Sequence, residues 1–370
     1  MTPWIYIYLA VFLVVFVLTG FIIPQILLIA FRKNLLDEAD PRKIHKGAVP
    51  RLGGIAFFPA ILFSLLLTIG MCMQIAPEFI RPILHEDFNV FCFTMCAVII
   101  LYLVGMADDL VGVKYRAKFV VQFLAAALVI SGGIYVGDLN GFLGVGKLPM
   151  SVAIALTVLL TVFITNAINL IDGIDGLASG LSSLACAFYG IIFFKAEQHA
   201  YGMLSFATLG ALVPFFCYNV FGNVKKHSKI FMGDTGALTI GLILSVLCFR
   251  TFQIESPTGN LNMAVVAFAP LMIPCLDVVR VYLNRLKSHR NPFLPDKSHI
   301  HHKLLALGIS QGVAMPAIVV SGLVLTLLNY WLCAFVNINI LLVIDLALWV
   351  VINMALTHFI TKRKAKQTDN

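Results

Sequence analysis

Residues 150–176 read MSVAIALTVLLTVFITNAINLIDGIDG, a long apolar run that ends in a short acidic segment. Residues 150–168 carry no charged side chain and have the length, ~20 residues, that a helix needs to cross a bilayer. The chain then turns polar at once, with Asp172 and Asp175 each followed by a glycine. Carboxylates this close to hydrocarbon are costly unless a cation or a cationic partner balances them. The stretch therefore predicts a membrane helix that ends at a charged functional site.

The whole chain has the composition of a polytopic membrane protein. Of its 370 residues, 60% are hydrophobic and only 12% are charged, and the mean hydropathy is +0.95. A soluble domain carries about 25% charged residues. We predict one all-α transmembrane catalytic domain, residues 1–370, with about eleven spans. The predicted spans cover residues 4–31, 52–73, 90–107, 119–136, 150–168, 177–194, 202–221, 236–252, 264–283, 313–333 and 339–360.

The distribution of lysine and arginine predicts the orientation. If the N-terminus lies outside, the inner loops, the C-terminal tail and Arg280 hold 22 of the 26 basic residues. Such a bias is a strong positive-inside signal, and it makes the C-terminus cytoplasmic. The net charge of +8 then indicates contact with anionic headgroups and phosphate ligands, and not with nucleic acid.

Two segments depart from the plain pattern of spans. Residues 137–149 have the glycine and turn spacing of a small hairpin on the outer side. Pro270 and Pro274 sit four residues apart inside the ninth predicted span, where each removes a helical hydrogen bond. We therefore predict that the ninth helix is kinked or broken, either as a plain structural kink or as the wall of a groove.

Adjacent acids end the third predicted span at Asp108 and Asp109. Neighbouring carboxylates repel each other unless a cation intervenes, and Lys118 follows within a few residues. Acids at the C-terminal end of a helix oppose its dipole, so capping of their own helix explains them poorly. The pair is therefore a candidate for catalysis.

The polar residues after the fifth span favour a magnesium site. Asn166, Asn169 and Asp172 recur every three residues and share one face of a helical extension. Gly173 and Gly176 then allow the backbone to turn tightly and to approach a ligand. Amide and carboxylate oxygens are both suitable ligands for Mg²⁺. The alternative is an ordinary polar turn between two spans.

Asp234 stands just before the eighth predicted span, in the stretch Phe231-Met-Gly-Asp234-Thr-Gly236. An acid in this position is ordinarily a helix cap, so the motif by itself is a weak signal. Its flanking glycines and the aromatic Phe231 favour a ligand site, and the two other acidic motifs strengthen that interpretation.

The last motif is Pro295-Asp296-Lys297-Ser298-His299-Ile300-His301-His302. Three histidines so close together suggest zinc, but no cysteine stands nearby, and His301 and His302 point apart on regular backbone. Histidine also donates to phosphate oxygens, and basic residues flank the motif, among them Lys303. We favour a phosphate contact over zinc, and a solvated basic loop remains the alternative.

Together these motifs resemble the polyprenyl-phosphate N-acetylhexosamine-1-phosphate transferase superfamily (glycosyltransferase family 4) over nearly the whole chain. The histidine block and eleven spans are similar to the branch that starts O-antigen, enterobacterial common antigen or teichoic acid linkage units. The phospho-MurNAc-pentapeptide branch, which has ten spans and another histidine block, is the alternative. The matching segments are His45-Lys46, Pro50–Gly54, Asp108-Asp109, Lys118, Gln122, Asn166–Leu177, Asn219, Phe231–Gly236 and Pro295–His302.

The resemblance implies a reaction at the plasma (inner) membrane of a bacterium, on its cytoplasmic side. Undecaprenyl phosphate would attack the β-phosphorus of a UDP-N-acetylhexosamine, foremost UDP-GlcNAc, and UMP would leave. The implied cofactor is Mg²⁺, with Mn²⁺ as a substitute. Anionic lipid and a second copy of the chain are the further partners that we expect.

The resemblance also assigns roles to individual residues. Asp108, Asp109 and Asp172 would be catalytic, and Asp234 and Asn169 would hold the metal. Ala237 departs from the family pattern, which usually has serine there, so a hydroxyl near the metal loop is missing. The residues expected to contact substrate are Lys46, Lys118, Asp175, Asn219, Phe231, His299, His301 and His302.

Two other classes of protein compete with this interpretation. An aspartate-rich prenyltransferase would need paired Asp-x-x-x-Asp motifs, and the chain instead has adjacent acids and a histidine block. A transporter would place its polar residues near the midplane of the membrane, usually within an internal repeat. Here they lie at the inner ends of the predicted spans. Asp345 and His358, inside predicted spans, receive no role.

Overall fold

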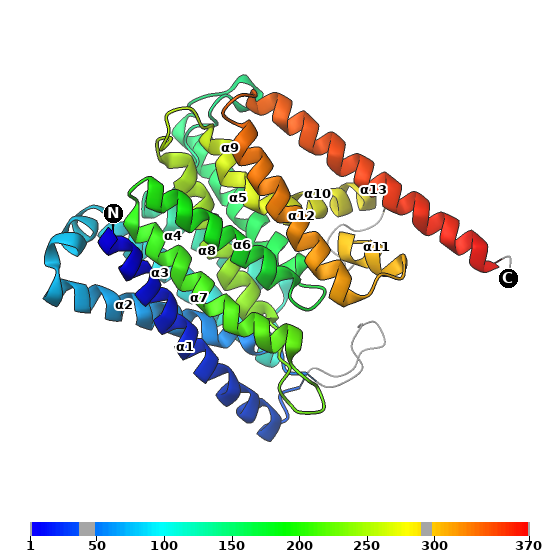
Figure 1. Ribbon diagram of the computed structural model, residues 1–370, viewed down its shortest axis with the longest axis horizontal. Helices are drawn as coiled ribbons and strands as arrows, with labels where there is room; N and C mark the ends of the chain where they lie inside the picture. Colours follow the sequence, from blue (N-terminus) through cyan, green and yellow to red (C-terminus); the bar gives the residue numbers. More distant parts are fainter. Residues whose placement is uncertain (1, 37–48, 290–297, 369–370) are drawn as a thin grey trace.

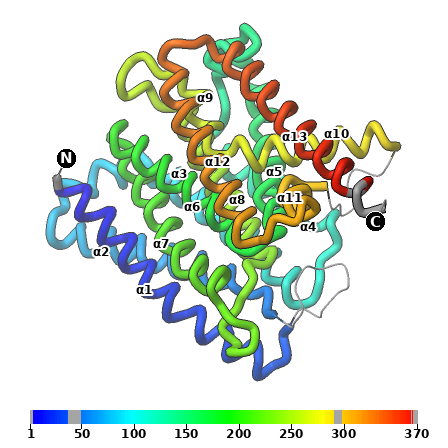
Figure 2. Tube along the Cα trace, turned by 45° about the vertical axis from the view of Figure 1, so that its right-hand side comes forward, coloured from blue at the N-terminus to red at the C-terminus, as the bar shows by residue number. Residues whose placement is uncertain are grey.

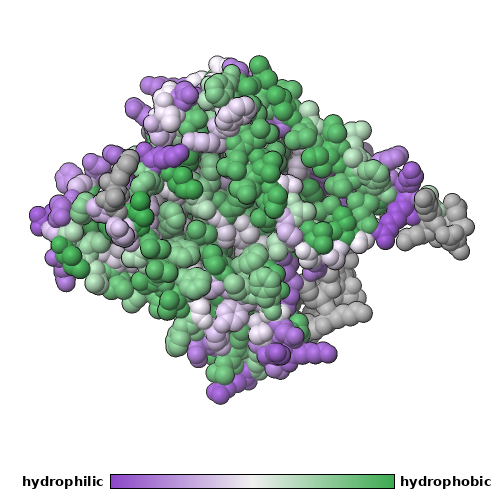
Figure 3. Space-filling view, viewed as in Figure 1, coloured by the Kyte–Doolittle hydropathy of each residue, from purple (hydrophilic) through white to green (hydrophobic). Residues whose placement is uncertain are grey.

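The chain folds into a bundle of membrane-length helices, seen in a computed structural model that describes residues 2–36, 49–289 and 298–368 (Figure 1). Lys46 therefore lies outside the described residues. Hydrophobic side chains cover the flank of the bundle, and hydrophilic ones gather towards its ends (Figure 3). The elements are α1 (Thr2–Arg32), η1 (Gly53–Ala56), α2 (Phe57–Ile75), α3 (Pro77–Val111), α4 (Tyr115–Ser131), η2 (Phe142–Gly144), α5 (Met150–Ile171), α6 (Leu177–Lys195), α7 (His199–Phe221), α8 (Gly233–Gln253), α9 (Met263–Phe268), η3 (Ala269–Leu271), α10 (Met272–Lys287), α11 (Ile300–Ala306), α12 (Gln311–Leu332) and α13 (Ile338–Thr368).

Ten helices or helix pairs in the described part of the chain are long and apolar enough to cross a membrane, against about eleven predicted. The difference is α4, which has 17 residues where a span over 119–136 is predicted. This length stands at the lower limit of the roughly 17–25 residues of a membrane-spanning helix. Helix α4 still runs from Lys118, beside Asp108, to the hairpin that follows it. By contrast, α3 has 35 residues and includes the predicted outer loop, because Pro77 and Glu78 favour a helix start there.

The predicted break in the ninth span is confirmed. α9 ends at Phe268, a 3-10 turn holds Pro270, and α10 begins at Met272. Figure 2 shows α10 (yellow) running from the middle of the molecule to its right-hand side. The predicted hairpin is also present, since Asp138 and Lys147 form an antiparallel bridge. The break lets α10 run beside the functional end of the bundle.

Helix α8 lies at the centre of the bundle. Of the residues in its most apolar 18-residue segment, 94% are buried. In the other spanning segments of the described chain this share does not exceed 67%. Its buried hydroxyl groups donate to carbonyls four residues earlier, as Thr239 does to Thr235 and Ser245 to Gly241. Such bonds satisfy polar groups that have no water to bind inside a membrane. The first turn of α8, which carries Asp234, is thereby held by the whole bundle.

Candidate active site

The N-terminus of α8 is capped by a residue of another helix, Asp109 at the end of α3. Asp109 accepts hydrogen bonds from the backbone N–H of Asp234 (2.8 Å), the backbone N–H of Thr235 (2.9 Å) and the Thr235 hydroxyl (2.5 Å). A carboxylate at a helix N-terminus satisfies unpaired N–H groups and complements the dipole. Capping of its own helix explains Asp109 poorly, but capping of α8 accounts for its position. Both oxygens of Asp109 are thus already engaged, and its catalytic role stays a prediction.

One lysine links the two other acids of this cluster. The Lys118 ammonium on α4 lies 2.7 Å from Asp234 Oδ2 and 3.2 Å from Asp108 Oδ2. The second oxygen of Asp108 accepts from the backbone N–H of Val113 at 2.7 Å. All three side chains are about one-fifth to one-quarter exposed, so their charges are only partly screened by water. The structure therefore brings together residues from α3, α4 and α8 that lie up to 126 positions apart.

Helix α5 contributes Asn169, whose side chain is a hydrogen-bond partner of Asp234. One turn earlier Asn166 donates to the buried Gln122 on α4 at 2.6 Å, which holds the ends of the two helices together. Asp234 and Asn169 thus supply one carboxylate and one amide oxygen side by side. Mg²⁺ in phosphate-transferring sites commonly takes one or two carboxylates and completes its shell with substrate oxygens. The residues present fit that pattern, although the metal itself remains a prediction.

Asp172 follows α5 and shares the surroundings of the other acids. Burial raises the pKa of Asp172 to about 7; Arg51 opposes the rise, and the charges of Asp175, Asp234 and Asp109 add to it. A carboxyl group with such a pKa gains and loses a proton near neutral pH, as a general base must.

Of the residues expected to frame the nucleoside, Asp175 and Phe231 lie in loops, and Asn219 lies near the end of α7. Asp175 pairs with Lys229 at 2.6 Å, a partner that residue spacing does not indicate. Asn219 accepts from the backbone N–H of Gly176 at 2.6 Å and donates to the Ile230 carbonyl at 2.9 Å. These bonds tie the loop after α5 to the loop before α8. Asn219 therefore already holds two loops in place, and its contact with substrate stays a prediction.

Phe231 lies half-buried in the loop before α8. Its backbone N–H donates to the Pro50 carbonyl, and its carbonyl accepts from Gly53, both at 2.9 Å. The next residue continues the pairing, because the Met232 carbonyl accepts from Gly54 at 2.9 Å. The motif around Gly53 and the motif around Asp234, far apart in sequence, are thus joined by backbone hydrogen bonds.

The histidine block meets this site through His301. A Cβ atom added to Gly173 would overlap the His301 ring, so the imidazole lies directly against the glycine loop after α5. The ring is 1% exposed, and neither nitrogen has a hydrogen-bond partner in the described part of the chain. Burial, and after it His302 and His299, lowers the pKa of His301 to about 3. His301 is therefore neutral and offers its nitrogens as hydrogen-bonding groups.

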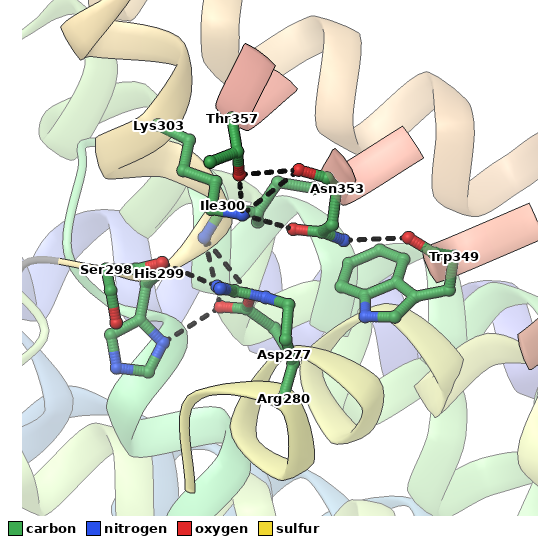
Figure 4. A network of polar contacts seen from close by, with 9 residues as sticks. All are labelled: Asp277, Arg280, Ser298, His299, Ile300, Lys303, Trp349, Asn353 and Thr357. Carbon is green, nitrogen blue, oxygen red and sulfur yellow. Dashed lines mark hydrogen bonds and ion pairs between the residues drawn. The ribbon is translucent and has the colours of Figure 1, made fainter. Parts of the chain in front are cut away.

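Lys303, by contrast, does not support the histidines as the sequence suggests. Its ammonium reaches α13, where it lies 3.1 Å from Asn353 Oδ1 and 3.1 Å from the Thr357 hydroxyl (Figure 4). His302 is half-buried and packs beside His301, with ring centroids 4.2 Å apart. Lys303 thus ties α11 to α13, a helix that sequence spacing alone could not identify as a neighbour.

The fold and these contacts define a polytopic membrane protein with an acidic, lysine-bridged site at one end of its bundle. Residues 91–251 match the sequence model of glycosyl transferase family 4. The chain belongs to this family, which confirms the resemblance that its motifs indicate.

Several relatives are similar to this chain along most of their length. A probable undecaprenyl-phosphate N-acetylglucosaminyl 1-phosphate transferase of Bacillus subtilis is 30% identical over 332 residues, which cover 87% of this chain and 86% of the relative. An undecaprenyl-phosphate alpha-N-acetylglucosaminyl 1-phosphate transferase of Yersinia pestis is 28% identical over 304 residues, or 81% and 78% of the two chains. The Escherichia coli K12 protein of the same name is 27% identical over 299 residues, or 80% and 76%.

Proposed function

We propose that the chain transfers N-acetylglucosamine-1-phosphate from UDP-N-acetylglucosamine to undecaprenyl phosphate and so starts a cell-envelope polysaccharide. The observation that carries this proposal is the Lys118 ammonium between Asp108 and Asp234, with Asn169 alongside. Such a mixed set of charges suits phosphoryl transfer, which depends on positioning and on charge neutralisation. The names of the relatives support the same reaction.

The proposed reaction joins the two substrates through phosphorus. A phosphate oxygen of the lipid forms a bond to the β-phosphorus of the nucleotide sugar. The bond from that phosphorus to the bridging oxygen breaks, and UMP leaves with the bridging oxygen. The products are UMP and the lipid diphosphate sugar.

We assign each residue of the site a separate role in this reaction. Asp234 and Asn169 would hold Mg²⁺, which when bound neutralises charge on the diphosphate. Lys118 would orient the phosphate of the lipid acceptor, and Asp172 would take up its proton. The histidine block would hydrogen-bond the diphosphate, and the loops around Phe231 would surround the uridine.

We further propose that the site faces the cytoplasm of a bacterial cell, because the loops that carry it belong to the basic side of the chain. The same basic loops would attract anionic lipids. A homodimer is the assembly that we expect from the family.

The purified protein with Mg²⁺, UDP-N-acetylglucosamine and undecaprenyl phosphate should release UMP, because the bond that breaks lies between the two phosphates. UMP release is measured by chromatography, with matched reactions that lack the lipid or the metal. UDP-GalNAc and UDP-MurNAc-pentapeptide serve as competing donors, and faster UMP release from the latter would assign the chain to the alternative branch. Release of UDP, or uptake of nucleotide sugar into vesicles without UMP, would refute the proposed reaction.

The pH dependence tests Asp172. We expect kcat/KM to rise as pH increases through about 7, because Asp172 loses its proton there and acts only as a carboxylate. Asp172→Asn should remove this rising limb and leave a slow rate that does not change with pH. His301 adds no limb in this range, since its pKa is about 3. A wild-type profile that is flat between about pH 6 and 8 would remove Asp172 from the catalytic group.

A further inference from the structure

A buried acid on α10, Asp277, joins the broken ninth helix to the histidine block (Figure 4). Its side chain is fully buried, at 0% exposure. One oxygen, Oδ1, accepts from Arg280 Nη2 at 2.7 Å. The backbone N–H of Ile300 is shared between Oδ1 at 3.1 Å and Oδ2 at 3.2 Å. The other oxygen, Oδ2, lies 2.8 Å from Nδ1 of His299. The acid therefore caps the start of α11 and at the same time holds the imidazole that precedes it.

Arg280 completes this arrangement. The same Nη2 group that pairs with Asp277 also donates to the Ser298 carbonyl at 2.5 Å. A buried carboxylate is stable only when it is paired and hydrogen-bonded, and Arg280 supplies the opposite charge. The backbone on both sides of His299 is thus held by one ion pair, so the position of the ring does not depend on substrate.

The contact with Asp277 decides which nitrogen of His299 faces outward. A carboxylate only accepts hydrogen bonds, so Nδ1 of His299 carries the proton and donates it. Nε2, on the other side of the ring, is the nitrogen that remains to bind a ligand. The ring lies parallel to that of His301, at an angle of 4° and a centroid distance of 5.8 Å. His301 in turn lies against Gly173 of the acidic loop.

We propose that Asp277 is a positioning residue of this active site: it holds Nδ1–H of His299, so that Nε2 faces the diphosphate of the nucleotide sugar and donates to it once that nitrogen carries a proton. An Asp–His pair of this kind also supports a positive charge on the imidazole when an anion approaches Nε2. The kinetic consequence rests on the proposed function, whereas the orientation of His299 does not.

The substitution Asp277→Asn separates this role from the capping of α11. Arg280 Nη2 and the Ile300 N–H can only donate, so the amide oxygen must stay on their side. The NH₂ group then faces His299 and donates to Nδ1, which forces the ring proton onto Nε2. The variant keeps the cap and the size of the side chain but reverses the tautomer and withdraws support for a charged ring.

Nitrogen NMR of histidine-labelled protein tests the orientation without any turnover, with His299→Gln identifying the signal. In the wild type we expect a protonated Nδ1 and an unprotonated Nε2 on His299, and in Asp277→Asn the reverse. Asp345→Asn is the matched control, because Asp345 is also a buried acid of a membrane helix and pairs with Asn329 instead. Unchanged His299 signals in Asp277→Asn would overturn the proposal.

The kinetic arm uses UMP release by the complete protein. Asp277→Asn should lower kcat about 10- to 100-fold with KM for UDP-N-acetylglucosamine unchanged, as expected for a group that acts through its neighbour. In a His299→Ala background the same substitution should have little further effect. An equally large loss in that background would show that Asp277 is only structural. If no variant and no wild type releases UMP, the proposed function fails, and the NMR result still decides the role of Asp277.

Discussion

Asp234→Asn should stop UMP release while the protein remains folded and inserted. The substitution removes the charge that pairs with Lys118 and the carboxylate that would hold the metal. It leaves the cap of α8 intact, because Asp109 binds the backbone N–H of residue 234 and not its side chain. We expect a loss of at least roughly 10²- to 10³-fold in kcat, the usual cost of removing one group that stabilises a transition state.

The matched control for this prediction is Asp138→Asn, in the hairpin at the opposite end of the bundle. Asp138 accepts from the backbone N–H of Asn140 at 2.8 Å, and asparagine keeps that acceptor. Both variants should elute from size-exclusion chromatography as the wild type does, and only Asp234→Asn should be inactive. Normal turnover by Asp234→Asn would exclude Asp234 from the site.

Gly54→Ala should destabilise the protein and abolish activity, although Gly54 carries no chemistry. A Cβ atom at this position would overlap the backbone of Gly236 in the first turn of α8. No change of rotamer relieves a clash with backbone, so η1 and α8 must move apart at a cost of about 1–3 kcal/mol or more. The movement would break the pairing of Gly53 with Phe231 and displace Asp234. Thermal unfolding in detergent and UMP release measure the two effects.

Gly70→Ala is the matched control for this second prediction. Gly70 lies inside α2, and an added Cβ would meet no atom within 4 Å. Alanine favours a helix over glycine by about 0.8–1 kcal/mol, so this variant should be as stable as the wild type or more so, and fully active. If Gly54→Ala behaved like Gly70→Ala, the close approach of η1 and α8 would be wrong.

Much of the fold could be predicted from local properties of the chain. The apolar runs that become α5, α6 and α7 were recognisable because a membrane helix needs only length and hydrophobicity. The break at Pro270 was predictable because proline cannot donate the hydrogen bond that a helix requires. The ends of α3 and α4 were less accurate, since packing can extend a helix through residues that read as a loop.

The candidate site was predictable as a set of residues but not as a set of contacts. Asp108, Asn169 and Asp234 stood out because each interrupts or borders an apolar segment. Their convergence could only be inferred from a shared side of the membrane. Residue spacing did not indicate that Asp175 pairs with Lys229. It also did not indicate that Lys303 contacts α13. The spacing of three residues between Asp277 and Arg280 did indicate their ion pair. Nothing in the sequence linked Asp277 to His299.

The amino-acid sequence alone determined that this chain is a membrane protein and which family it resembles. It also identified the polar side chains that are costly next to apolar segments unless they have a function. These are properties of short segments, and they do not depend on how the segments pack against each other. The three-dimensional packing alone decided what each acid does: Asp109 caps a distant helix, Asp234 meets a lysine, and Asp277 holds an imidazole. A hydrogen bond depends on tenths of an ångström between helices that lie far apart in the chain, and no local pattern encodes that distance.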